Sequence, residues 1–499
     1  MAYLLGFDVG SSSVKASLID AETGRRIASA TSPETELDIK AVKPGWAEQD
    51  PNTWWEHVKL SSARIAKEHA KRMKEVSAIG ISYQMHGLVI VDKTGKTLRD
   101  SIIWCDSRAV SYGEKAFKDL GEEFCLREFL NSPGNFTASK LAWVKENEPD
   151  VFKNIYRIML PGDYIAYKMT GRIVTTPSGL SEGILWNAKE NRVATEILDY
   201  YGIPEDFIPE IVPSFAVQGE LTKEAAELLS VPTGIPVSYR AGDQPNNAFS
   251  LAVLNPGEIA ATAGTSGVVY GVIDSPAYDK RSRVNTFVHV NHSENSRRYG
   301  VLMCLNGTGI LNRWLKQNTA DNRYGNIDYQ ELNNLAQSVE PGSHGLKVYP
   351  YGNGAERTLE NRNLGASIVG LNFNIHSRAH LLRAGQEGIA FALAYGMEIM
   401  KEMGMPVGVV RAGEANMFLS PVFREVFSNV SDARIELFST DGSEGAARGA
   451  GVGAGIYSDY KQAFVGLEKK KEEEPDYALA KRYKELYEEW KKTLENMLS

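Results

Sequence analysis

Apolar residues in the first part of the chain occur in short runs that predict β-strands. Residues 3–7 form an apolar run, Ser11 to Ser13 form a turn, and Val14 to Asp20 alternate as a second strand. Glu22-Thr23-Gly24 predicts another turn, and Arg25 to Ala30 a further strand. Short runs of this kind, bounded by turn residues, are typical of paired strands. We therefore expect an antiparallel start to the chain.

The pattern then changes to a helical period. Pro51 is expected to open a helix with Asp50 as its N-cap, since Asp is a favoured cap and Pro a favoured first residue. The apolar face of this helix would contain Trp54, Trp55, Val58, Ala63 and Ile65. Strands are predicted over Val76 to Ser82, Leu88 to Asp92 and Ile102 to Trp104. Helical and irregular segments are expected from 107 to 230, including a helix through Lys140 to Val144.

The second half of the chain repeats the opening pattern. Residues 262–274 can be laid on residues 8–20 without a gap, and each contains a strand, a turn of small hydroxyl residues and a second strand. The identical pairs are Gly10/Gly264, Ser12/Ser266, Val14/Val268, Ile19/Ile273 and Asp20/Asp274. We interpret this match as two domains built on one plan and facing each other.

Helices and strands are expected to alternate through the rest of the chain, with glycine-rich turns at 351–354, 411–416 and 441–455. Gly449, Gly451 and Ala454 resemble a dinucleotide-binding motif, but this run of small residues is more typical of a closely packed helix. A charged run at 469–474 precedes apolar residues at helical spacing. These are Leu479, Tyr483, Leu486, Tyr487, Trp490, Leu494 and Leu498. They predict an amphipathic closing helix that packs on its own domain or on a partner chain.

Length and composition set the broad class. A chain of 499 residues is too long for one hydrophobic core. We expect domains over 1–245 and 246–460 and a helical tail over 461–499. The apolar fraction of 43% is ordinary for a globular protein, and the net charge of −8 argues against a general nucleic-acid binder. A membrane-spanning helix needs about 18 or more consecutive apolar residues, and the sequence contains no such run.

The cysteines and the N-terminus favour a cytoplasmic location. Cys105, Cys125 and Cys304 are widely spaced, without the pairs that are typical of disulfide frameworks or zinc sites. The N-terminus lacks a basic region, and Asp8 interrupts its apolar run, so a signal peptide is not expected.

The most informative stretch lies near the middle of the chain, over residues 239–247. The apolar run from Ile235 to Tyr239 leads into a carboxylate, Asp243, flanked by small and amide residues. An ionised group at the end of a buried strand must be paired, hydrated or bound to a metal. Asp243 is therefore a candidate functional acid, and a helix N-cap is the structural alternative.

The two hydroxyl-rich turns suit phosphate binding. Backbone amides in a tight turn form a concavity for anions, and Ser and Thr hydroxyls add donors. Asp8 directly precedes the first turn. In phosphoryl transfer an acid accepts the proton of the attacking hydroxyl or holds Mg²⁺ against the phosphates. We predict that Asp243 is the base and that Asp8 orients the metal. The alternatives are ordinary hairpin turns and a purely structural Asp8.

Two further segments predict a sugar pocket. Gln84-Met85-His86-Gly87 and Trp104-Cys105-Asp106-Ser107-Arg108 each follow a predicted strand and combine flat apolar surface with hydrogen-bonding groups. A polyol presents apolar C–H faces and many hydroxyls, which such a surface can bind. The structural alternative is that His86 is satisfied within the fold and that Trp104 belongs to the core.

These segments resemble, in order and spacing, the FGGY family of carbohydrate kinases from Leu5 to about Gly455. The markers are Asp8-Val-Gly-Ser-Ser-Ser-Val-Lys15, Trp46-Ala-Glu-Gln-Asp-Pro51 with Trp54-Trp55, Gln84-Met-His-Gly87, Trp104-x-Asp-x-Arg108, Lys140-Leu-x-Trp143, Leu160-Pro-x-Asp-Tyr164, Gly242-Asp-Gln244, Gly264-Thr-Ser-Gly267 and Glu444-Gly-Ala-Ala447.

The resemblance implies an α/β fold of two actin-like, ribonuclease-H-like domains around a deep cleft. It implies an enzyme that uses ATP and Mg²⁺ to phosphorylate D-xylulose to D-xylulose 5-phosphate, with Asp243 as general base and with Asp8 and Asp243 at the metal. The sugar would contact Gln84, Met85, His86, Trp104, Asp106 and Gln244. The nucleotide would contact Ser11, Ser12, Ser13, Lys15, Gly264, Thr265, Ser266, Gly309, Arg313, Gly413, Glu414 and Asn416.

The chain departs from the pattern of the family's pentulose kinases at several positions. Cys105 stands where asparagine is usual, and Gly242-Asp243-Gln244 resembles members that act on glycerol or ribulose. Arg411 to Asn416 replaces a triple-glycine turn. Another kinase of the family, for ribulose, another pentulose, gluconate or glycerol, therefore stays an alternative. A sugar-binding protein without catalysis and an actin-like filament protein are rivals of other classes. The expected partners are a sugar and ATP, without nucleic acid or membrane, and a homodimer stays open.

Overall fold

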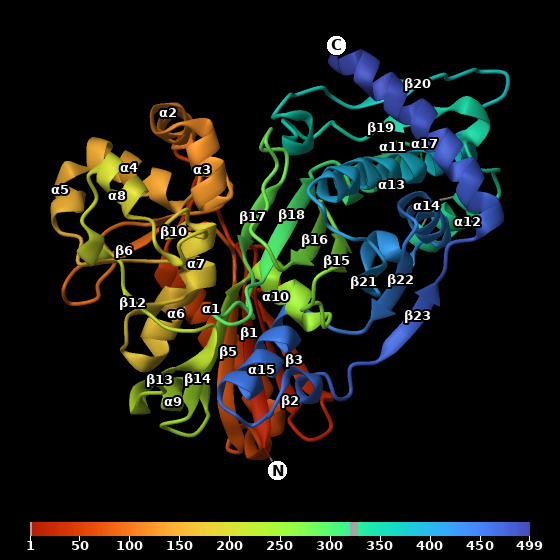
Figure 1. The fold of residues 1–499 in the computed structure, drawn as a ribbon. Helices are drawn as coiled ribbons and strands as arrows, with labels where there is room; N and C mark the ends of the chain where they lie inside the picture. Colours follow the sequence, from red (N-terminus) through yellow and green to blue (C-terminus); the bar gives the residue numbers. More distant parts are fainter. Residues whose placement is uncertain (1, 320–327) are drawn as a thin grey trace.

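Two mixed β-sheets form the centres of two α/β domains in the computed structural model, which describes residues 2–319 and 328–499 (Figure 1). The first sheet has the order β13 (Phe215–Glu220), β14 (Pro236–Gly242), β5 (Val76–Tyr83), β1 (Tyr3–Val9), β2 (Val14–Asp20) and β3 (Arg26–Ser32). β1 pairs antiparallel with β2 and parallel with β5, and β14 continues the parallel side. The predicted antiparallel start is confirmed.

The second sheet repeats this plan. Its order is β17 (Asn285–Val288), β18 (Tyr299–Leu305), β16 (Gly267–Ile273), β15 (Glu258–Ala263), β21 (Val409–Gly413), β22 (Arg434–Phe438) and β23 (Lys469–Glu473). β15 pairs antiparallel with β16 and parallel with β21, as β1 does with β2 and β5. The predicted α/β class, with two domains, is confirmed.

The gapless overlay of the two hairpins needs a correction. In the first hairpin Val9 pairs with Val14, so residues 10–13 form the turn. In the second hairpin Ala263 pairs with Gly267, so the turn contains only residues 264–266. The second turn is therefore one residue shorter. The identities beyond it, such as Val14 with Val268, do not mark equivalent positions in the sheets.

The α-helices lie on both sheets and around the first domain (Figure 1). Their bounds are α1 (Pro51–Met73), α2 (Val110–Leu120), α3 (Glu122–Phe129), α4 (Thr137–Asn147), α5 (Pro149–Lys153), α6 (Pro161–Thr170), α7 (Pro177–Glu182), α8 (Thr195–Tyr201), α9 (Lys223–Leu229), α10 (Asp243–Ser250), α11 (Gly309–Asn318), α12 (Tyr329–Gln337), α13 (Arg378–Glu402), α14 (Pro421–Ser431), α15 (Gly442–Gly453), α16 (Tyr460–Ala463) and α17 (Tyr477–Leu498). The predicted cap of α1 is confirmed, because the Asp50 carboxylate accepts a hydrogen bond of 2.9 Å from the Asn52 amide.

Short strands and turns complete the fold. The pairs are β4 (Glu48–Gln49) with β7 (Ser101–Ile102), β6 (Val89–Val91) with β8 (Arg157–Met159), β9 (Val174–Thr175) with β12 (Glu210–Ile211), β10 (Trp186–Asn187) with β11 (Arg192–Val193) and β19 (Lys347–Tyr349) with β20 (Ser367–Val369). Turns of 3₁₀ helix are η1 (Glu205–Phe207), η2 (Ser343–Gly345), η3 (Arg357–Leu359) and η4 (Asn416–Leu419). The segment 107–230 thus contains strands that the sequence pattern did not predict, and the strand predicted through Trp104 ends at Ile102.

The glycine-rich turn predicted at 441–455 is wrong, because most of it is helix α15. In the sequence α15 lies between β22 and β23 of the second sheet, yet it packs on the first sheet. A Cβ atom on Gly6 would lie 2.0 Å from the Ser443 carbonyl oxygen, and one on Gly80 would lie 1.9 Å from that of Ala446. The small residues therefore allow this helix to approach the sheet closely, as the helical alternative expected.

Helix α10 makes the reciprocal crossing. It follows β14 of the first sheet, and its buried Ala248 packs with Ala260 and Tyr270 of the second sheet. The Asn246 side chain donates a hydrogen bond of 2.8 Å to the carbonyl of Gly442, at the start of α15. Two crossed helices thus join the domains: α10 begins with the candidate acid Asp243, and Gly442, which begins α15, lies against the candidate acid Asp8.

The C-terminal tail packs on the second domain, as predicted. The charged run at 469–474 forms the edge strand β23, which the sequence pattern did not predict. Helix α17 then buries Trp490 against Tyr349, with ring centroids 4.9 Å apart, and the indole donates to the Val348 carbonyl at 3.0 Å. Within the described ranges, helices that combine the length and the apolar character needed to cross a bilayer are lacking.

Candidate active site

Asp243 begins helix α10 directly after strand β14, at the junction of the two domains. Gly242 occupies the N-cap position, so the N-cap alternative for Asp243 is wrong. Burial raises the pKa of the Asp243 carboxyl to about 7, and the nearby negative charge of Asp8 acts in the same direction. Hydrogen bonds from Gln244 oppose this rise. Asp243 is therefore a partly buried acid that can take up and release a proton near neutral pH.

Asp8 lies near the end of β1, opposite Lys15 on β2 and Ser82 on β5. The Ser82 hydroxyl donates to its carboxylate at 2.8 Å. A Cβ atom on Gly442 would lie 2.3 Å from the other carboxylate oxygen, so the first residue of α15 must be glycine for Asp8 to fit. Burial raises the pKa of Asp8, although the hydrogen bond from Ser82 lowers it.

Lys15 does not pair with Asp8 directly. Its ammonium donates to Asp441 at 2.5 Å, and Asp441 caps α15 by accepting from the amides of Ser443 and Glu444. The lysine that we expect at the phosphates is thus tied to the helix that crosses onto the first sheet. Sequence reasoning missed Asp441, because it lies in a segment that was predicted to be a glycine-rich turn.

The donor set at Asp8 and Asp243 fits a hard cation. Mg²⁺ prefers oxygen ligands and is usually bound by one or two carboxylates together with substrate phosphates. The chain offers two carboxylates here, and a cation would relieve the repulsion that raises the pKa of Asp243. In the part of the chain that the structure describes, larger groups of His, Cys, Asp or Glu with metal-binding geometry are absent.

The loop after β5 carries Met85 and His86 toward Asp243. A Cβ atom on Gly242 would lie 2.6 Å from the Met85 side chain, so this loop packs directly on the residue before Asp243. Trp104 is 52% exposed, and its indole donates to the Ser11 hydroxyl at 3.3 Å. The expected sugar loop and the expected phosphate turn are therefore joined by a direct contact, while Gln244 lies beside Asp243 on α10.

Two predicted sugar contacts lie deeper than expected. Gln84 is 2% exposed, and its amide nitrogen donates to Gln49 at 3.4 Å. Asp106 is completely buried, with its carboxylate bound to the Arg108 guanidinium at 2.6 Å and to the Ala47 amide at 2.6 Å. The direct sugar contact predicted for Asp106 is not available in this structure, because both oxygens are already engaged. Asp106 instead shapes the loop.

Sequence reasoning gave no role in the site to two buried ionisable residues near the sugar loops. Lys140 on α4 donates to the backbone carbonyls of His86 at 2.8 Å and Ile103 at 3.0 Å. Glu182 lies at the end of α7, with a carboxylate oxygen 2.5 Å from where a Cβ on Gly242 would be. Burial raises the pKa of Glu182 well above its ordinary value. Our search for acids at the ends of strands could not find residues on helices.

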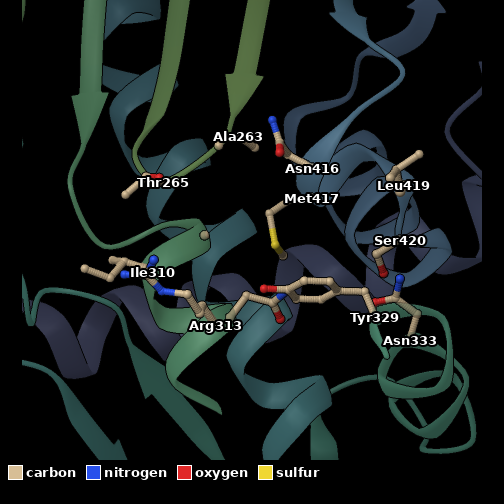
Figure 2. Close-up of a pocket in the computed structure, with 13 residues that line it drawn as sticks. Ala263, Thr265, Ile310, Arg313, Tyr329, Asn333, Asn416, Met417, Leu419 and Ser420 are labelled. Carbon is tan, nitrogen blue, oxygen red and sulfur yellow. The ribbon is translucent and has the colours of Figure 1, made fainter. Parts of the chain in front are cut away.

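A cavity of about 280 Å³ opens beside the second sheet (Figure 2). Five residues that we expected to contact the nucleotide line it, namely Gly264, Thr265, Gly309, Arg313 and Asn416. Ser266, Gly413 and Glu414 do not line it. In Figure 2 the side chain of Met417 points toward the ring of Tyr329. The cavity also contains residues that no sequence motif indicated: Asn333, Leu419 and Ser420.

The wall of this cavity explains why residue 309 is glycine. The Gly309 amide donates to the Gly264 carbonyl at 2.8 Å, which joins the start of α11 to the hairpin turn. A Cβ atom on Gly309 would lie 2.2 Å from that carbonyl oxygen. Only glycine permits this approach, and it brings the N-terminus of a helix, which favours anions, to the hydroxyl-rich turn.

Comparisons with known proteins agree with this arrangement. The N-terminal and C-terminal domain models of the FGGY family of carbohydrate kinases match residues 3–250 and 259–456. Xylulose kinase from Staphylococcus xylosus is 29% identical, over 93% of this chain and 92% of its own. Xylulose kinase from Haemophilus influenzae is 28% identical, over 97% and 98%. The crystal structure of xylulose kinase from Rhodospirillum rubrum, 25% identical, superposes with a TM-score of 0.89 over 99% of both chains. This chain thus belongs to the FGGY family of carbohydrate kinases and is an enzyme of that family.

Proposed function

We propose that this enzyme transfers the γ-phosphoryl group of ATP to the terminal hydroxyl of D-xylulose, giving D-xylulose 5-phosphate. The observation that carries the proposal is the placement of Asp243, whose pKa of about 7 suits a general base, next to the loop of Met85. The names of the relatives that match nearly the whole chain support D-xylulose as the acceptor.

In this proposal Asp243 accepts the proton of the attacking sugar hydroxyl as the new O–P bond forms. Its carboxylate form is populated near neutral pH. Asp8 accepts a hydrogen bond from Ser82 and positions the cation. The bond between the γ-phosphorus and the bridging oxygen breaks, and ADP leaves with the negative charge on that oxygen. Asp243 then returns its proton to solvent.

The nucleotide is proposed to lie in the cavity of the second domain. Its phosphates would meet the two turns at Ser11 to Ser13 and Gly264 to Ser266, with Lys15 nearby, and its nucleoside would meet Arg313, Tyr329 and Asn416. Gly413 and Glu414 would lie at the edge of this site. Mg²⁺, held by Asp8 and Asp243, would neutralise charge on the phosphates.

Another acceptor of the same class is the second candidate. Cys105 is exposed on the expected sugar loop, and Gln244 follows the base. A site built to bind one pattern of hydroxyls strongly rejects substrates that lack that pattern. These two residues therefore favour testing ribulose, gluconate and glycerol beside D-xylulose. The cytoplasmic location and the homodimer stay predictions.

The decisive experiment measures ADP release from the purified enzyme with Mg-ATP. D-xylulose is compared with D-ribulose, L-ribulose, L-xylulose, gluconate and glycerol. Strong stimulation by D-xylulose above the others is expected. Stronger stimulation by another polyol would overturn D-xylulose as the acceptor and retain the base and the metal site. If no polyol stimulates ADP release, the kinase proposal fails, and the sugar-binding alternative would then be tested by calorimetry.

A further inference from the structure

Arg357 is an arginine without an acidic partner among the described residues. It begins η3 of the second domain and is partly buried. Across residues 2–319 and 328–499 it forms no ion pair, and only Nη1 of its guanidinium is hydrogen-bonded, to the carbonyl and the hydroxyl of Ser282 at 3.3 and 3.4 Å. Burial lowers the pKa of Arg357, yet an arginine stays charged in proteins. Its Nε and Nη2 edge therefore carries a charge that a ligand can meet.

Contacts between the domains place Arg357 near an expected sugar loop. The Ser282 hydroxyl, which accepts from Arg357, donates to the hydroxyl of Ser132 in the first domain at 3.4 Å. The segment after Ser282 leads into β17, where Phe287 packs on the His86 ring with centroids 5.5 Å apart. The positive charge of Arg357 adds to the lowering of the pKa of His86, of which burial is the main cause. Arg357 thus faces this loop from the second domain.

Three other cations near the expected sugar and phosphate contacts are already engaged. Arg108 is bound to Asp106 at 2.6 Å, and Lys15 is bound to the aspartate that caps α15 at 2.5 Å. Lys140 is completely buried and donates to two backbone carbonyls beneath the loops. Two of the three are neutralised by carboxylates and the third is enclosed, which leaves the partly buried Arg357 to meet a ligand.

The chemistry of the proposed acceptor supplies a matching group. In the ring form of D-xylulose the terminal hydroxyl oxygen is part of the ring, so this oxygen can attack ATP only in the open-chain form. The open chain has a free ketone carbonyl near its other end, and that oxygen accepts hydrogen bonds but cannot donate. An arginine side chain donates but cannot accept, so the two groups are complementary. An alditol has a hydroxyl in this place, whose hydrogen would need a further acceptor.

Resting on the proposed function, we propose that Arg357 determines specificity by donating, from the second domain, to a sugar oxygen that can only accept hydrogen bonds. In D-xylulose this oxygen is the ketone carbonyl, and in a sugar acid it is a carboxylate oxygen. The contacts with Ser282 hold one side of the guanidinium and leave the Nε and Nη2 edge for the sugar. Arg357 binds the end of the sugar that is remote from the reacting hydroxyl, and it takes no part in the proton transfer to Asp243.

Calorimetry without ATP tests this role with two ligands. D-xylulose and xylitol contain the same carbon and oxygen atoms and differ at the carbonyl. The wild-type enzyme should bind D-xylulose about 10- to 100-fold more tightly, as expected for a hydrogen bond to a charged group. Arg357→Met should reduce this preference to within about twofold, by weakening the binding of D-xylulose. Equal affinities of the wild-type enzyme for the two ligands would overturn the proposal.

D-gluconate distinguishes the two sources of the accepting oxygen. Weaker binding of D-gluconate than of D-xylulose would identify the ketone as the group that Arg357 recognises. If D-gluconate binds more tightly and Arg357→Met removes that preference, the role of Arg357 holds and the accepted sugar is an acid, which overturns D-xylulose as the acceptor. If Arg357→Met leaves the affinities for both ligands unchanged, the role of Arg357 is wrong.

Arg281→Met is the matched control. Arg281 directly precedes Ser282, and its guanidinium is bound to Glu360 at the surface, so it joins the same two segments of the second domain. It should leave both affinities and their ratio unchanged. If Arg281→Met removes the preference as well, η3 merely supports the domain junction and the direct role of Arg357 is wrong. Arg357→Lys keeps the charge and should retain part of the preference, and it replaces Arg357→Met if that variant does not fold.

The binding measurements keep this inference separate from the proposed function, because they require no phosphoryl transfer. If the wild-type enzyme prefers D-xylulose to xylitol as expected but phosphorylates neither, only the proposed function fails. If D-xylulose is phosphorylated and Arg357→Met discriminates as the wild type does, only this inference fails. In steady-state kinetics, Arg357→Met should raise the KM for the sugar about 10- to 100-fold and change kcat by less than about threefold, since the lost contact binds the sugar before and during the reaction. A fall in kcat alone would overturn the role in specificity.

Discussion

The two hairpins that open the two sheets share a plan but differ in charge. β1–β2 and β15–β16 each join a strand to its antiparallel neighbour through a turn of small hydroxyl residues. The next-to-last residue of the first strand is Asp8 in the first hairpin and Thr262 in the second. One framework thus carries an acid on one side and a neutral hydroxyl on the other. We infer that the first hairpin carries out the ionic chemistry and that the second hairpin binds the nucleotide.

The surroundings of the two turns extend this contrast. On the first side, Asp8 and Asp243 lie close enough that one charge raises the pKa of the other. On the second side, Arg313 is the charged side chain among the described residues that line the cavity, and the backbone of Gly309 closes on the turn. The following predictions test whether the two sides divide their roles in this way.

The largest effect is expected on the first side, from Asp243→Asn. This change removes the proposed base and keeps its shape. General-base catalysis contributes about 10²–10⁴-fold, so kcat should fall by that factor while the affinity for the sugar changes little. The measurement is steady-state phosphorylation together with sugar binding by calorimetry.

Asp50→Asn is the matched control for this prediction. Asp50 also lies at a helix N-terminus, where it caps α1, and Asn is an equally favoured cap. It should keep full activity. An Asp243→Asn enzyme with near-normal kcat would show that another group accepts the proton.

The next effect tests the contrast directly, by placing the residue of the second hairpin in the first. Asp8→Thr should lower kcat/KM by about 10- to 100-fold, or about 1.4–2.8 kcal/mol of the barrier. It should also move the acid limb of the pH profile. Asp243 acts in its deprotonated form, and removal of the negative charge of Asp8 lowers the pKa of Asp243 from about 7. The limb should therefore shift to lower pH.

Asp8→Asn separates charge from shape in this experiment. Its amide keeps the size of the side chain and an oxygen that accepts from Ser82, but it carries no charge. Both variants should give the same shift. An acid limb that stays in place in both would mean that the charge of Asp8 does not act on the base.

The same contrast explains what the sequence could and could not predict. Strand ends and hydroxyl turns indicated Asp8, Asp243 and Thr265 as candidates, because strand period and residue type are local properties. Lys140 and Glu182 were not assigned to the site, since their effect depends on helices that pack beneath the loops only in the folded chain. The turn predicted at 441–455 was wrong for a similar reason, because its glycines serve the close packing on the first sheet that the helical interpretation of Gly449 to Ala454 expected.

On the second side we expect a smaller effect, from Gly309→Ala. The added methyl group would meet the Gly264 carbonyl at 2.2 Å, so the start of α11 must move away from the turn. Overpacking of this kind costs about 1–3 kcal/mol. The KM for ATP should rise more than the KM for the sugar, and the melting temperature should fall. Gly408→Ala is the control, since its Cβ would meet nothing within 4 Å. Equal effects of the two substitutions on the KM for ATP would contradict the packing argument.

The smallest effect separates two neighbours within the second turn. Thr265 lines the cavity and is exposed, whereas Ser266 does not line it. If the turn binds phosphate through the hydroxyl that faces the cavity, Thr265→Val should raise the KM for ATP by about 3- to 10-fold, the value of one hydrogen bond of about 0.5–1.5 kcal/mol. Ser266→Ala should change it by less than about twofold. Initial rates at saturating sugar measure both. A larger effect of Ser266→Ala than of Thr265→Val would place the phosphates on the other face of the turn. Equal small effects would mean that only the backbone amides of this turn bind the phosphates. The second hairpin would then contribute no side-chain chemistry at all, in the greatest possible contrast to the acidic first hairpin.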